Sequence, residues 1–285
     1  MEESFDFFSR KRGIFFEVEI LRQRYDESAW TRCGIDDPKK KMADYDVIIE
    51  DLVAANRILA AQEIVDAFGH VSARHPQKPD RFLLSQAKSP ELVEADDIME
   101  FILDGVAIDS RGRKGYLERF IHGGLYEARP DIQSVVHSHS RSVIPFGLTQ
   151  ERLRPVVHSS GMMGREIPVW DAQRSFGDTD LLVSNTSMGR DLARTFGNGN
   201  CVLMRGHGST VAGKSIREAV YAAFYLEVNA HSQLEASRLG KITSLTPGEI
   251  EKVNSRLSQG KPGEGFDRFW EYWCRRVGVN FSTRS

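Results

Sequence analysis

The feature that most constrains this chain is a pair of histidines at the end of an apolar run. Residues 134–139 read Ser-Val-Val-His-Ser-His, a pattern that predicts a β-strand. Side chains two residues apart on a strand lie on the same face, so His137 and His139 can converge on one metal ion. The alternative is that both are polar residues on the exposed face of a strand.

A third histidine follows a second apolar run, residues 201–204. His207 lies between Gly206 and Gly208, and glycine permits backbone angles and close approaches that other residues do not. A glycine-rich turn with an incidental histidine is the alternative. Three histidines are sufficient for a catalytic metal site, because such sites use three protein ligands and keep one position open.

Glu118 is the fourth candidate for the site, at the beginning of a predicted helix over residues 117–127. A carboxylate in the first helical turn is also what the helix dipole favours, without any function. His122 lies four residues further on, on the same helical face, where it could orient Glu118.

The remaining pattern predicts helices, strands and three regions of the chain. Periodicity and turn residues predict helices at 46–67, 187–196 and 215–239, and strands at 71–74, 81–85, 99–103, 106–108, 155–158, 167–169, 180–183 and 201–204. We expect residues 1–40 to be an N-terminal extension, an arm onto a neighbouring subunit. Residues 41–245 are expected to form the catalytic domain and residues 246–285 a helical, aromatic tail.

Composition excludes some classes of partner. The net charge of −2 and the pI near 6.5 argue against nucleic acids and anionic membrane surfaces, which require a concentrated basic face. Neither a membrane-spanning run nor a secretory signal is expected. The three cysteines, Cys33, Cys201 and Cys274, are far apart and indicate reduced thiols of a cytoplasmic protein.

Taken together, four motifs resemble the class II aldolase and adducin family over residues 46–239. They are Glu-Arg-Phe-Ile-His at 118–122, Tyr-Glu-Ala-Arg-Pro-Asp at 126–131, Val-Val-His-Ser-His at 135–139 and Arg-Gly-His-Gly at 205–208. The resemblance implies an α/β fold, a three-layer α/β/α domain around a mainly antiparallel sheet. It also implies homotetramers with active sites at subunit interfaces. By the same resemblance, His137, His139 and His207 bind a divalent metal (Mn²⁺, Zn²⁺ or Fe²⁺), and Glu118 is an acid/base or an extra ligand.

The loops that hold a phosphate in sugar-phosphate members of this family are different here. His70 stands where an asparagine is usual, residues 85–90 read Ser-Gln-Ala-Lys-Ser-Pro, and Tyr116 and Leu117 replace two serines. These changes remove hydroxyls and space that a phosphate dianion would need, although Lys88 and Arg74 could still receive an anion.

Segments 116–123, 143–146 and 176–180 resemble the branch of decarboxylases acting on hydroxylated aromatic or pyridine dicarboxylates. A small carboxylate substrate is therefore expected, whose loss of CO₂ leaves a carbanion or dienolate that a metal stabilises. Glu118 or His70 would deliver the proton to carbon. We expect substrate contacts from five residues, with structural roles as the alternative for His70 and His158: Arg74, Ser85, Lys88, Tyr116 and His158.

Three other functions remain compatible with the sequence. The first is an aldolase or epimerase acting on a sugar or sugar acid. The second is a non-haem iron oxygenase, because three histidines, or two with Glu118, also suit Fe(II). The third is an adducin-like interaction module, which the three retained histidines argue against.

Overall fold

The computed structural model describes residues 38–259 and 265–279 of the 285. The chain divides into two compact units, residues 1–46 and 47–285. Of the first unit only residues 38–46 are described, and they begin helix α3 (Pro38–Ala61). The expected arm, residues 1–40, therefore lies almost wholly outside the described residues. The division into extension, catalytic domain and tail stays a prediction.

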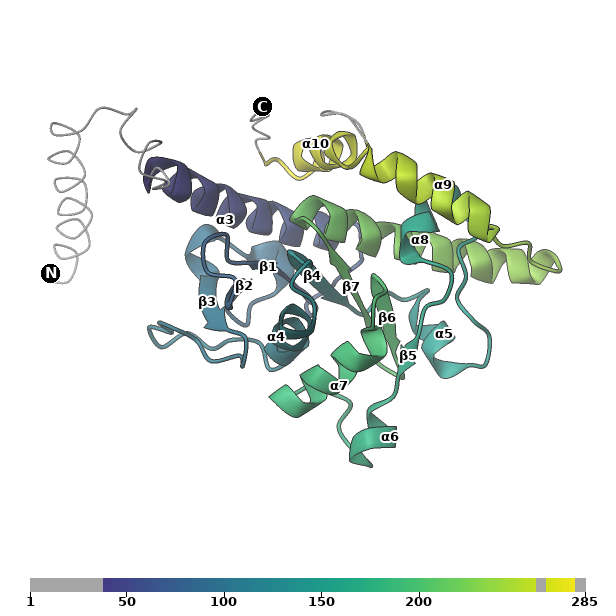
Figure 1. The fold of residues 1–285 in the computed structure, drawn as a ribbon, viewed down its shortest axis with the longest axis horizontal. Coiled ribbons are helices and arrows are strands. Elements are labelled where there is room, and N and C mark those ends of the chain that lie inside the picture. The colour runs from purple at the N-terminus through teal and green to yellow at the C-terminus, as the bar shows by residue number, and fades with distance from the viewer. Residues whose placement is uncertain (1–37, 260–264, 280–285) are drawn as a thin grey trace, which may run out of the picture. The chain divides into compact units, whose positions relative to one another are not determined.

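A seven-stranded sheet forms the centre of the second unit (Figure 1). Every neighbouring pair of strands is antiparallel except β5 and β6, which are parallel, so the expected mainly antiparallel sheet is confirmed. Across the sheet the strands are β3 (Ile98–Ile102), β2 (Arg81–Ser85), β1 (His70–Arg74), β4 (Ser134–Ser138), β7 (Gly208–Gly213), β6 (Cys201–Met204) and β5 (Val169–Trp170).

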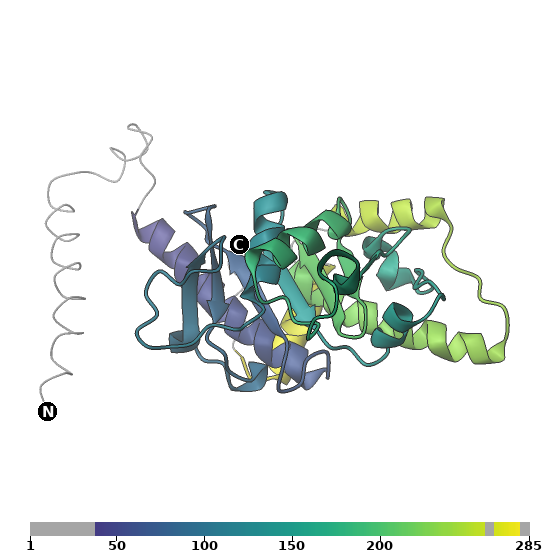
Figure 2. The ribbon, with the colours of Figure 1, turned by 90° about the horizontal axis from the view of Figure 1, so that it is seen from below.

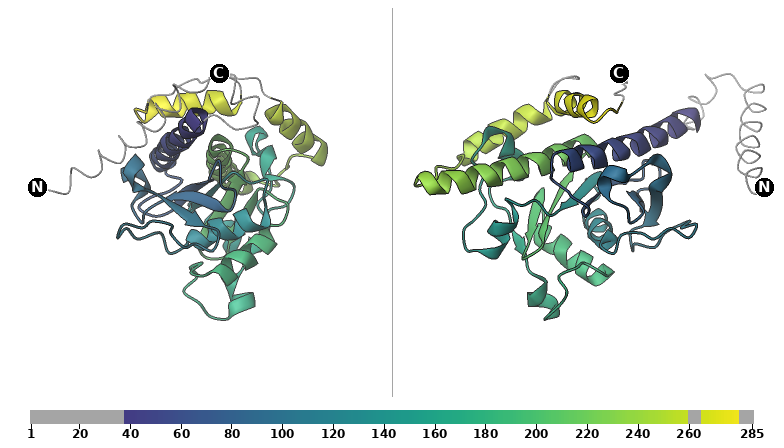
Figure 3. Two further views of the ribbon diagram at one scale, coloured as in Figure 1. Left: turned by 60° about the vertical axis from the view of Figure 1, so that its left-hand side comes forward. Right: turned by 180° about the vertical axis from the view of Figure 1, so that it is seen from behind.

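Helices cover both faces of the sheet, which gives the three expected layers. Helix α8 (Ile216–Leu239) packs over β4 and β7, whereas α4 (Arg119–Ala128) and α7 (Thr186–Phe196) pack together on the other face (Figures 1 and 2). On the α8 side, α10 (Phe266–Arg276) packs against α8, and α9 (Pro247–Ser258) against the 3-10 helix η3 (His158–Met163) (Figure 3). Short helices join the larger elements: η1 (Pro90–Leu92), η2 (Ala95–Asp97), α5 (Ile144–Leu148) and α6 (Ala172–Phe176).

The main apolar core lies between the sheet and the layer of α4 and α7. This core contains alternate residues of β2, Phe82 and Leu84, together with Leu125 of α4 and Leu192 of α7, and all four are fully buried. Burying one such side chain contributes about 1.5–3 kcal/mol relative to leaving it exposed. The central strands and α4, which carry most of the candidate site residues, are thus fixed to each other by packing.

Several predicted elements were wrong in position or kind. Residues 155–158 and 180–183 form no strand, and residues 106–108 make one isolated bridge with β3 rather than a full return strand. The first helix ends at Ala61 and the predicted strand 167–169 is found at 169–170. Short apolar runs can be buried by side-chain packing alone, as at Val183, and such runs resemble strands in sequence.

Strand β7 was not predicted, because its sequence Gly-Ser-Thr-Val-Ala-Gly has neither apolar alternation nor bulky residues. It nevertheless lies in the middle of the sheet and is buried along its whole length. Within the described residues, no helix has the length and apolarity to span a bilayer.

Candidate metal centre

Three imidazoles and one carboxylate converge at the C-terminal end of β4. One ligand atom from each of Glu118, His137, His139 and His207 lies within 4.8 Å of all the others. The Nε2 atoms of His137 and His139 are 3.2 Å apart, and Glu118 Oε2 is 3.4 Å from His137 Nε2 and 3.5 Å from His207 Nε2. Tetrahedral bonds of about 2.1 Å place ligand atoms roughly 3.4 Å apart, so this donor set fits a divalent ion.

Three segments of the chain supply these groups. His137 lies in β4, His139 directly follows that strand, and His207 lies in the turn between β6 and β7. The two glycines around His207 are needed for different reasons. Gly206 has φ +68°, and a Cβ on Gly208 would lie 2.1 Å from the Ser138 carbonyl oxygen and 3.1 Å from the His139 ring.

Glu118 is the residue immediately before α4 and is buried. Its Oε1 accepts a hydrogen bond of 3.0 Å from the Val183 backbone N–H, which leaves Oε2 on the side of the histidines. Burial alone would raise the pKa of Glu118, but His137 and His207 outweigh burial and hold it well below its ordinary value. The carboxylate is therefore ionised and can act as a ligand or as a base.

The surroundings of the three histidine rings differ. The Nδ1 atom of His137 is 3.4 Å from the Thr210 hydroxyl, which orients that ring, while His207 Nδ1 is buried without a hydrogen-bond partner. Burial, with His137 and His207 nearby, lowers the pKa of His139 to about 4. A neutral imidazole with a free lone pair is the form that binds a metal.

His70 lies beside this centre, with its ring centroid 5.1 Å from that of His137. Its Nδ1 is 2.6 Å from His122 Nε2, and the other nitrogen of His122 is 2.6 Å from the Ser72 hydroxyl. The Ser72 hydroxyl is also 2.8 Å from the Tyr126 hydroxyl. The expectation that His122 orients Glu118 was therefore wrong, because both ring nitrogens of His122 are engaged with His70 and Ser72.

These contacts belong to a regular pattern that we name the β1–α4 ladder. Its members on β1 are two residues apart in sequence, and its members at the start of and along α4 are four residues apart, so each set lies on one face. Burial lowers the pKa of His122 to about 3 and that of His70 well below 6.5, with nearby histidines adding to both effects. The members of the ladder are His70, Ser72 and Arg74 on β1, and Glu118, His122 and Tyr126 at the start of and along α4.

Three of the predicted substrate residues gather on the other side of His70. The Tyr116 ring lies 4.6 Å from the His70 ring, and its hydroxyl is 3.1 Å from Ser85 Oγ and donates to the Lys88 carbonyl. The Lys88 ammonium is paired with Asp97 at 2.6 Å. Tyr116 is therefore placed beside the centre, whereas the charge of Lys88 is already compensated within the protein.

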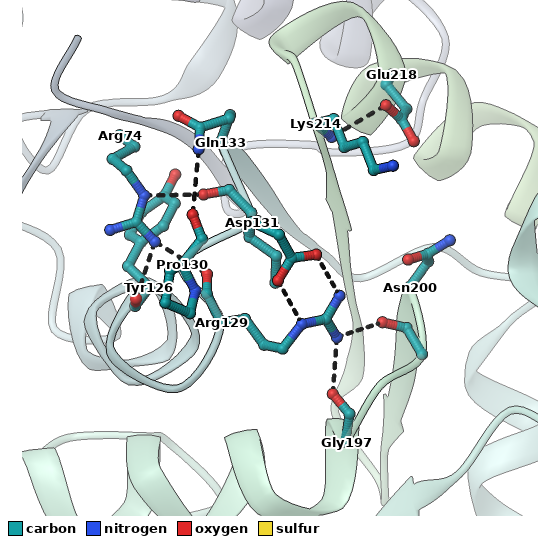
Figure 4. A network of polar contacts seen from close by, with 12 residues as sticks. Arg74, Tyr126, Arg129, Pro130, Asp131, Gln133, Gly197, Asn200, Lys214 and Glu218 are labelled. Atoms are coloured by element: carbon teal, nitrogen blue, oxygen red, sulfur yellow. Dashed lines mark hydrogen bonds and ion pairs between the residues drawn. The ribbon is translucent and has the colours of Figure 1, made fainter. Parts of the chain in front are cut away.

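The prediction that Arg74 contacts a substrate anion was wrong. Arg74 lies at the opposite end of β1 from His70, and its guanidinium donates to four backbone carbonyls, those of Pro79, Tyr126, Arg129 and Ile132. Figure 4 shows the bonds to Tyr126 and Arg129. With its donors occupied in this way and only 6% of its surface exposed, Arg74 anchors the loop after α4.

The remaining predicted substrate residue is His158. His158 begins η3, is exposed, and belongs to a segment that packs against α8 and α9, so its predicted substrate contact stays a prediction. Arg205 donates to Asp171 at 2.6 Å in a partly exposed ion pair.

Sequence reasoning missed Ser72, Tyr126, Thr210 and the Val183 amide. The spacing of Tyr126 from Glu118 and His122 was visible, because four-residue steps share a helical face. Thr210 could not be found, since its strand was not predicted. Val183 contributes through its backbone, which no side-chain pattern reveals.

Comparisons with known proteins agree with this geometry. A model of the class II aldolase and adducin N-terminal domain matches residues 50–234. A protein named decarboxylase tropJ from Talaromyces stipitatus is 33% identical over 80% of this chain and 93% of its own length. A 3,4-dihydroxyphthalate decarboxylase from Arthrobacter keyseri is 30% identical over 67% of this chain and 79% of its own length.

A solved structure shows the same fold. The crystal structure of an aldolase II superfamily protein from Pseudomonas syringae superimposes with a TM-score of 0.68 and 22% identity, over 87% of this chain and 96% of that one. The sequence match covers most of the chain, and the sheet and its helical layers agree with it. The chain therefore belongs to the class II aldolase and adducin family.

Proposed function

We propose that this protein is a metal-dependent decarboxylase of a hydroxylated aromatic or heteroaromatic carboxylate. The observation that carries the proposal is the convergence of Glu118, His137, His139 and His207 within 4.8 Å. Relatives that cover most of the chain and are named decarboxylases support a carboxy-lyase on this fold.

The three histidines would hold the ion, and Glu118 would act beside them. Three imidazole nitrogens with an open coordination position suit Mn²⁺, Zn²⁺ or Fe²⁺. When bound, such an ion supplies a Lewis acid for the substrate oxygens next to the bond that breaks.

Glu118 is the residue best placed to carry the proton. It would take the hydroxyl proton of the substrate as the reaction begins. The bond between the ring carbon and the carboxylate then breaks, CO₂ leaves, and the electron pair stays on the ring carbon. The proton on Glu118 bonds to that carbon, and one proton from water restores the hydroxyl. The hydrogen bond from Val183 to Oε1 supports this role, because it fixes the carboxylate while Oε2 faces the histidines.

The side chains next to the metal ligands favour a flat substrate. His70 and Tyr116 place two aromatic rings there, 4.6 Å apart, and aromatic faces stack on planar rings. Tyr116 also occupies the position where sugar-phosphate members have a small hydroxyl residue. This supports an aromatic carboxylate over a sugar phosphate.

We further propose that the protein is a cytoplasmic homotetramer with its sites at subunit interfaces. Support comes from apolar side chains close to Glu118 in sequence that are about half exposed or more: Val106 at 60%, Leu117 at 50% and Ile108 at 47%. Side chains of this kind are typical of surfaces that another subunit covers. Analytical ultracentrifugation of the metal-loaded protein tests this, and a monomer would contradict it.

The activity is tested by measuring CO₂ release from ortho-hydroxy aromatic mono- and dicarboxylates by protein loaded in turn with Mn²⁺, Zn²⁺ and Fe²⁺. Release with stoichiometric appearance of the phenol is expected. Turnover restricted to sugars or sugar acids would replace the proposal with an aldolase or epimerase. Dioxygen consumption would replace it with an oxygenase, and failure to bind any of the three ions would leave the interaction module.

A further inference from the structure

The hydrogen bonds of the β1–α4 ladder form a chain that is closed at its inner end. The chain runs from His70 through His122 and Ser72 to the Tyr126 hydroxyl. Tyr126 is 1% exposed, and the Arg74 guanidinium lies 4.8 Å from the centre of its ring. The chain therefore leads from the metal centre into the core and not to water.

The closed end sets the direction of every hydrogen bond in the chain. The hydrogen bond found for the Tyr126 hydroxyl among the described residues joins it to Ser72 Oγ, and this bond decides where the phenol proton lies. The acceptor open to that proton is Ser72 Oγ at 2.8 Å, because a buried hydroxyl proton left without an acceptor is destabilising. Ser72, having accepted that proton, donates its own to His122 Nδ1.

His122 then carries its proton on Nε2, the atom that is 2.6 Å from His70 Nδ1. Two ring nitrogens at this distance share a single proton, so His70 Nδ1 must accept. The proton of a neutral His70 is consequently on Nε2. That atom makes no hydrogen bond to any residue the structure describes, although the ring as a whole is buried between Tyr116 and His137.

We infer that Tyr126, Ser72 and His122 are positioning residues that fix His70 as a one-way hydrogen-bond donor, with its Nε2–H offered to an oxygen of the substrate. The inference rests on the proposed function and deepens it. A donor fixed in advance next to a developing negative charge stabilises that charge without reorganising when the reaction occurs.

The same chain argues against His70 as the residue that gives up a proton. A proton lost from Nε2 would have to be replaced along the chain from the Tyr126 phenol. This would leave a tyrosinate in the core, where burial already holds the pKa of Tyr126 far above its ordinary value. Glu118 therefore carries the proton, and His70 donates a hydrogen bond.

The tautomer of His70 tests the inference directly, without substrate. Nitrogen-15 NMR of the full protein, loaded with Zn²⁺ and labelled in its histidine rings, reports which nitrogen holds the proton, with His70 assigned from a His70→Gln variant. We expect Nε2 in the wild type. Tyr126→Phe and Ser72→Ala should each allow a second tautomer, because the direction of the chain is no longer imposed.

Ser134→Ala is the matched control. Ser134 is also a fully buried serine on a central strand, and its hydroxyl donates to the Ser72 carbonyl at 2.7 Å, but it is outside the chain. It should leave the His70 tautomer unchanged. A wild-type His70 protonated on Nδ1, or an unchanged tautomer in folded Tyr126→Phe and Ser72→Ala variants, would overturn the inference.

Kinetics of CO₂ release add a second readout. Ser72→Ala should lower kcat about 10- to 100-fold, as loss of an outer orienting partner commonly does. His122→Gln, which keeps an N–H toward His70, should retain at least tenfold more activity than His122→Asn. If His70 donates only a hydrogen bond, His70→Gln keeps the wild-type shape of the kcat–pH profile, whereas loss of one limb would overturn the inference.

The two proposals can fail separately. If His70 carries its proton on Nε2 but the protein decarboxylates no aromatic carboxylate, the proposed function is wrong, whereas the direction of the hydrogen bonds from Tyr126 to His70 is still supported. Decarboxylation together with a His70 proton on Nδ1 would end the inference and leave the function.

Discussion

His70 and His137 lie directly opposite each other on the antiparallel strands β1 and β4, and Thr210 continues their row on β7. One imidazole of the row is a metal ligand in our proposal, the second is a hydrogen-bond donor, and the hydroxyl orients the first. Because opposite residues on paired strands are fixed by register, the metal ligand and the donor cannot move independently. A substitution that disturbs either strand should therefore affect both.

Removing a metal ligand and removing the proton carrier should have different effects. His139→Ala deletes one of three imidazoles, so bound metal and CO₂ release should be lost together. Glu118→Gln keeps three imidazoles and should retain metal while kcat falls about 10²- to 10⁴-fold, the usual contribution of a general acid–base group. Metal content by atomic emission and kcat on the same samples check both.

Glu127→Gln is the control for Glu118→Gln, because Glu127 lies on the same helix and pairs at the surface with Arg190. It should change kcat less than twofold. Wild-type turnover in Glu118→Gln or His139→Ala would remove that residue from the site.

Gly208→Ala should impair the site although no ligand is removed. Its Cβ would lie 2.1 Å from the Ser138 carbonyl oxygen, so β7 and β4 must separate next to His139. We expect metal affinity to fall at least tenfold by calorimetric titration. Gly248→Ala is the matched control, since nothing lies within 4 Å of its Cβ, and it should bind metal as the wild type does. Equal affinities in the two variants would contradict the prediction.

Arg74→Lys should reduce stability and spare the chemistry. Lysine cannot reach the four carbonyls that the guanidinium binds, and hydrogen bonds from charged groups contribute about 1.5–3 kcal/mol each. We expect a loss of about 2–4 kcal/mol in urea unfolding, with KM within twofold of wild type. Arg111→Lys, at an exposed ion pair, should change neither quantity. A raised KM with unchanged stability would restore Arg74 as a substrate residue.

Metal-free protein should become less stable as the pH falls below about 6.5. The pKa of His122 is about 3 in the folded protein and 6.5 in the unfolded chain. Between these two pH values, His122 is therefore protonated in the unfolded chain and neutral in the folded protein. Each pH unit in this window removes about 1.4 kcal/mol for that one group. His70 and His139, also lowered, act in the same direction.

Urea unfolding at pH 7, 6 and 5 measures how the free energy of unfolding changes with pH. In His122→Gln this change should be smaller by the contribution of one histidine, about 1.4 kcal/mol per pH unit. Constant stability from pH 7 to 5 in the wild type would show that these histidines are not held neutral.

The convergence of the three histidines and most regular elements could be predicted because their signals are local. The apolar periodicity of β2, β4, β6 and α8 and the two-residue step from His137 to His139 each lie within a short window of sequence. The β1–α4 ladder could not be predicted, because it depends on how β1 and α4 are aligned. Its facing residues His70 and His122 are 52 positions apart in sequence. The lack of bulky residues concealed β7, and the buried Val183 made an irregular segment resemble a strand.

The ladder also works because two different repeats have nearly equal lengths. Two residues advance a strand by about 6.6 Å, and four residues advance a helix by about 6.0 Å. Over three successive members, the positions along β1 and along α4 therefore differ by only about 1.2 Å, so each β1 member stays level with its α4 member. This fit depends on the two repeats and not on the number of residues that join the two elements. A single deletion inside β1 is not tolerated in the same way, because it turns His70 or Ser72 to the opposite face of the sheet.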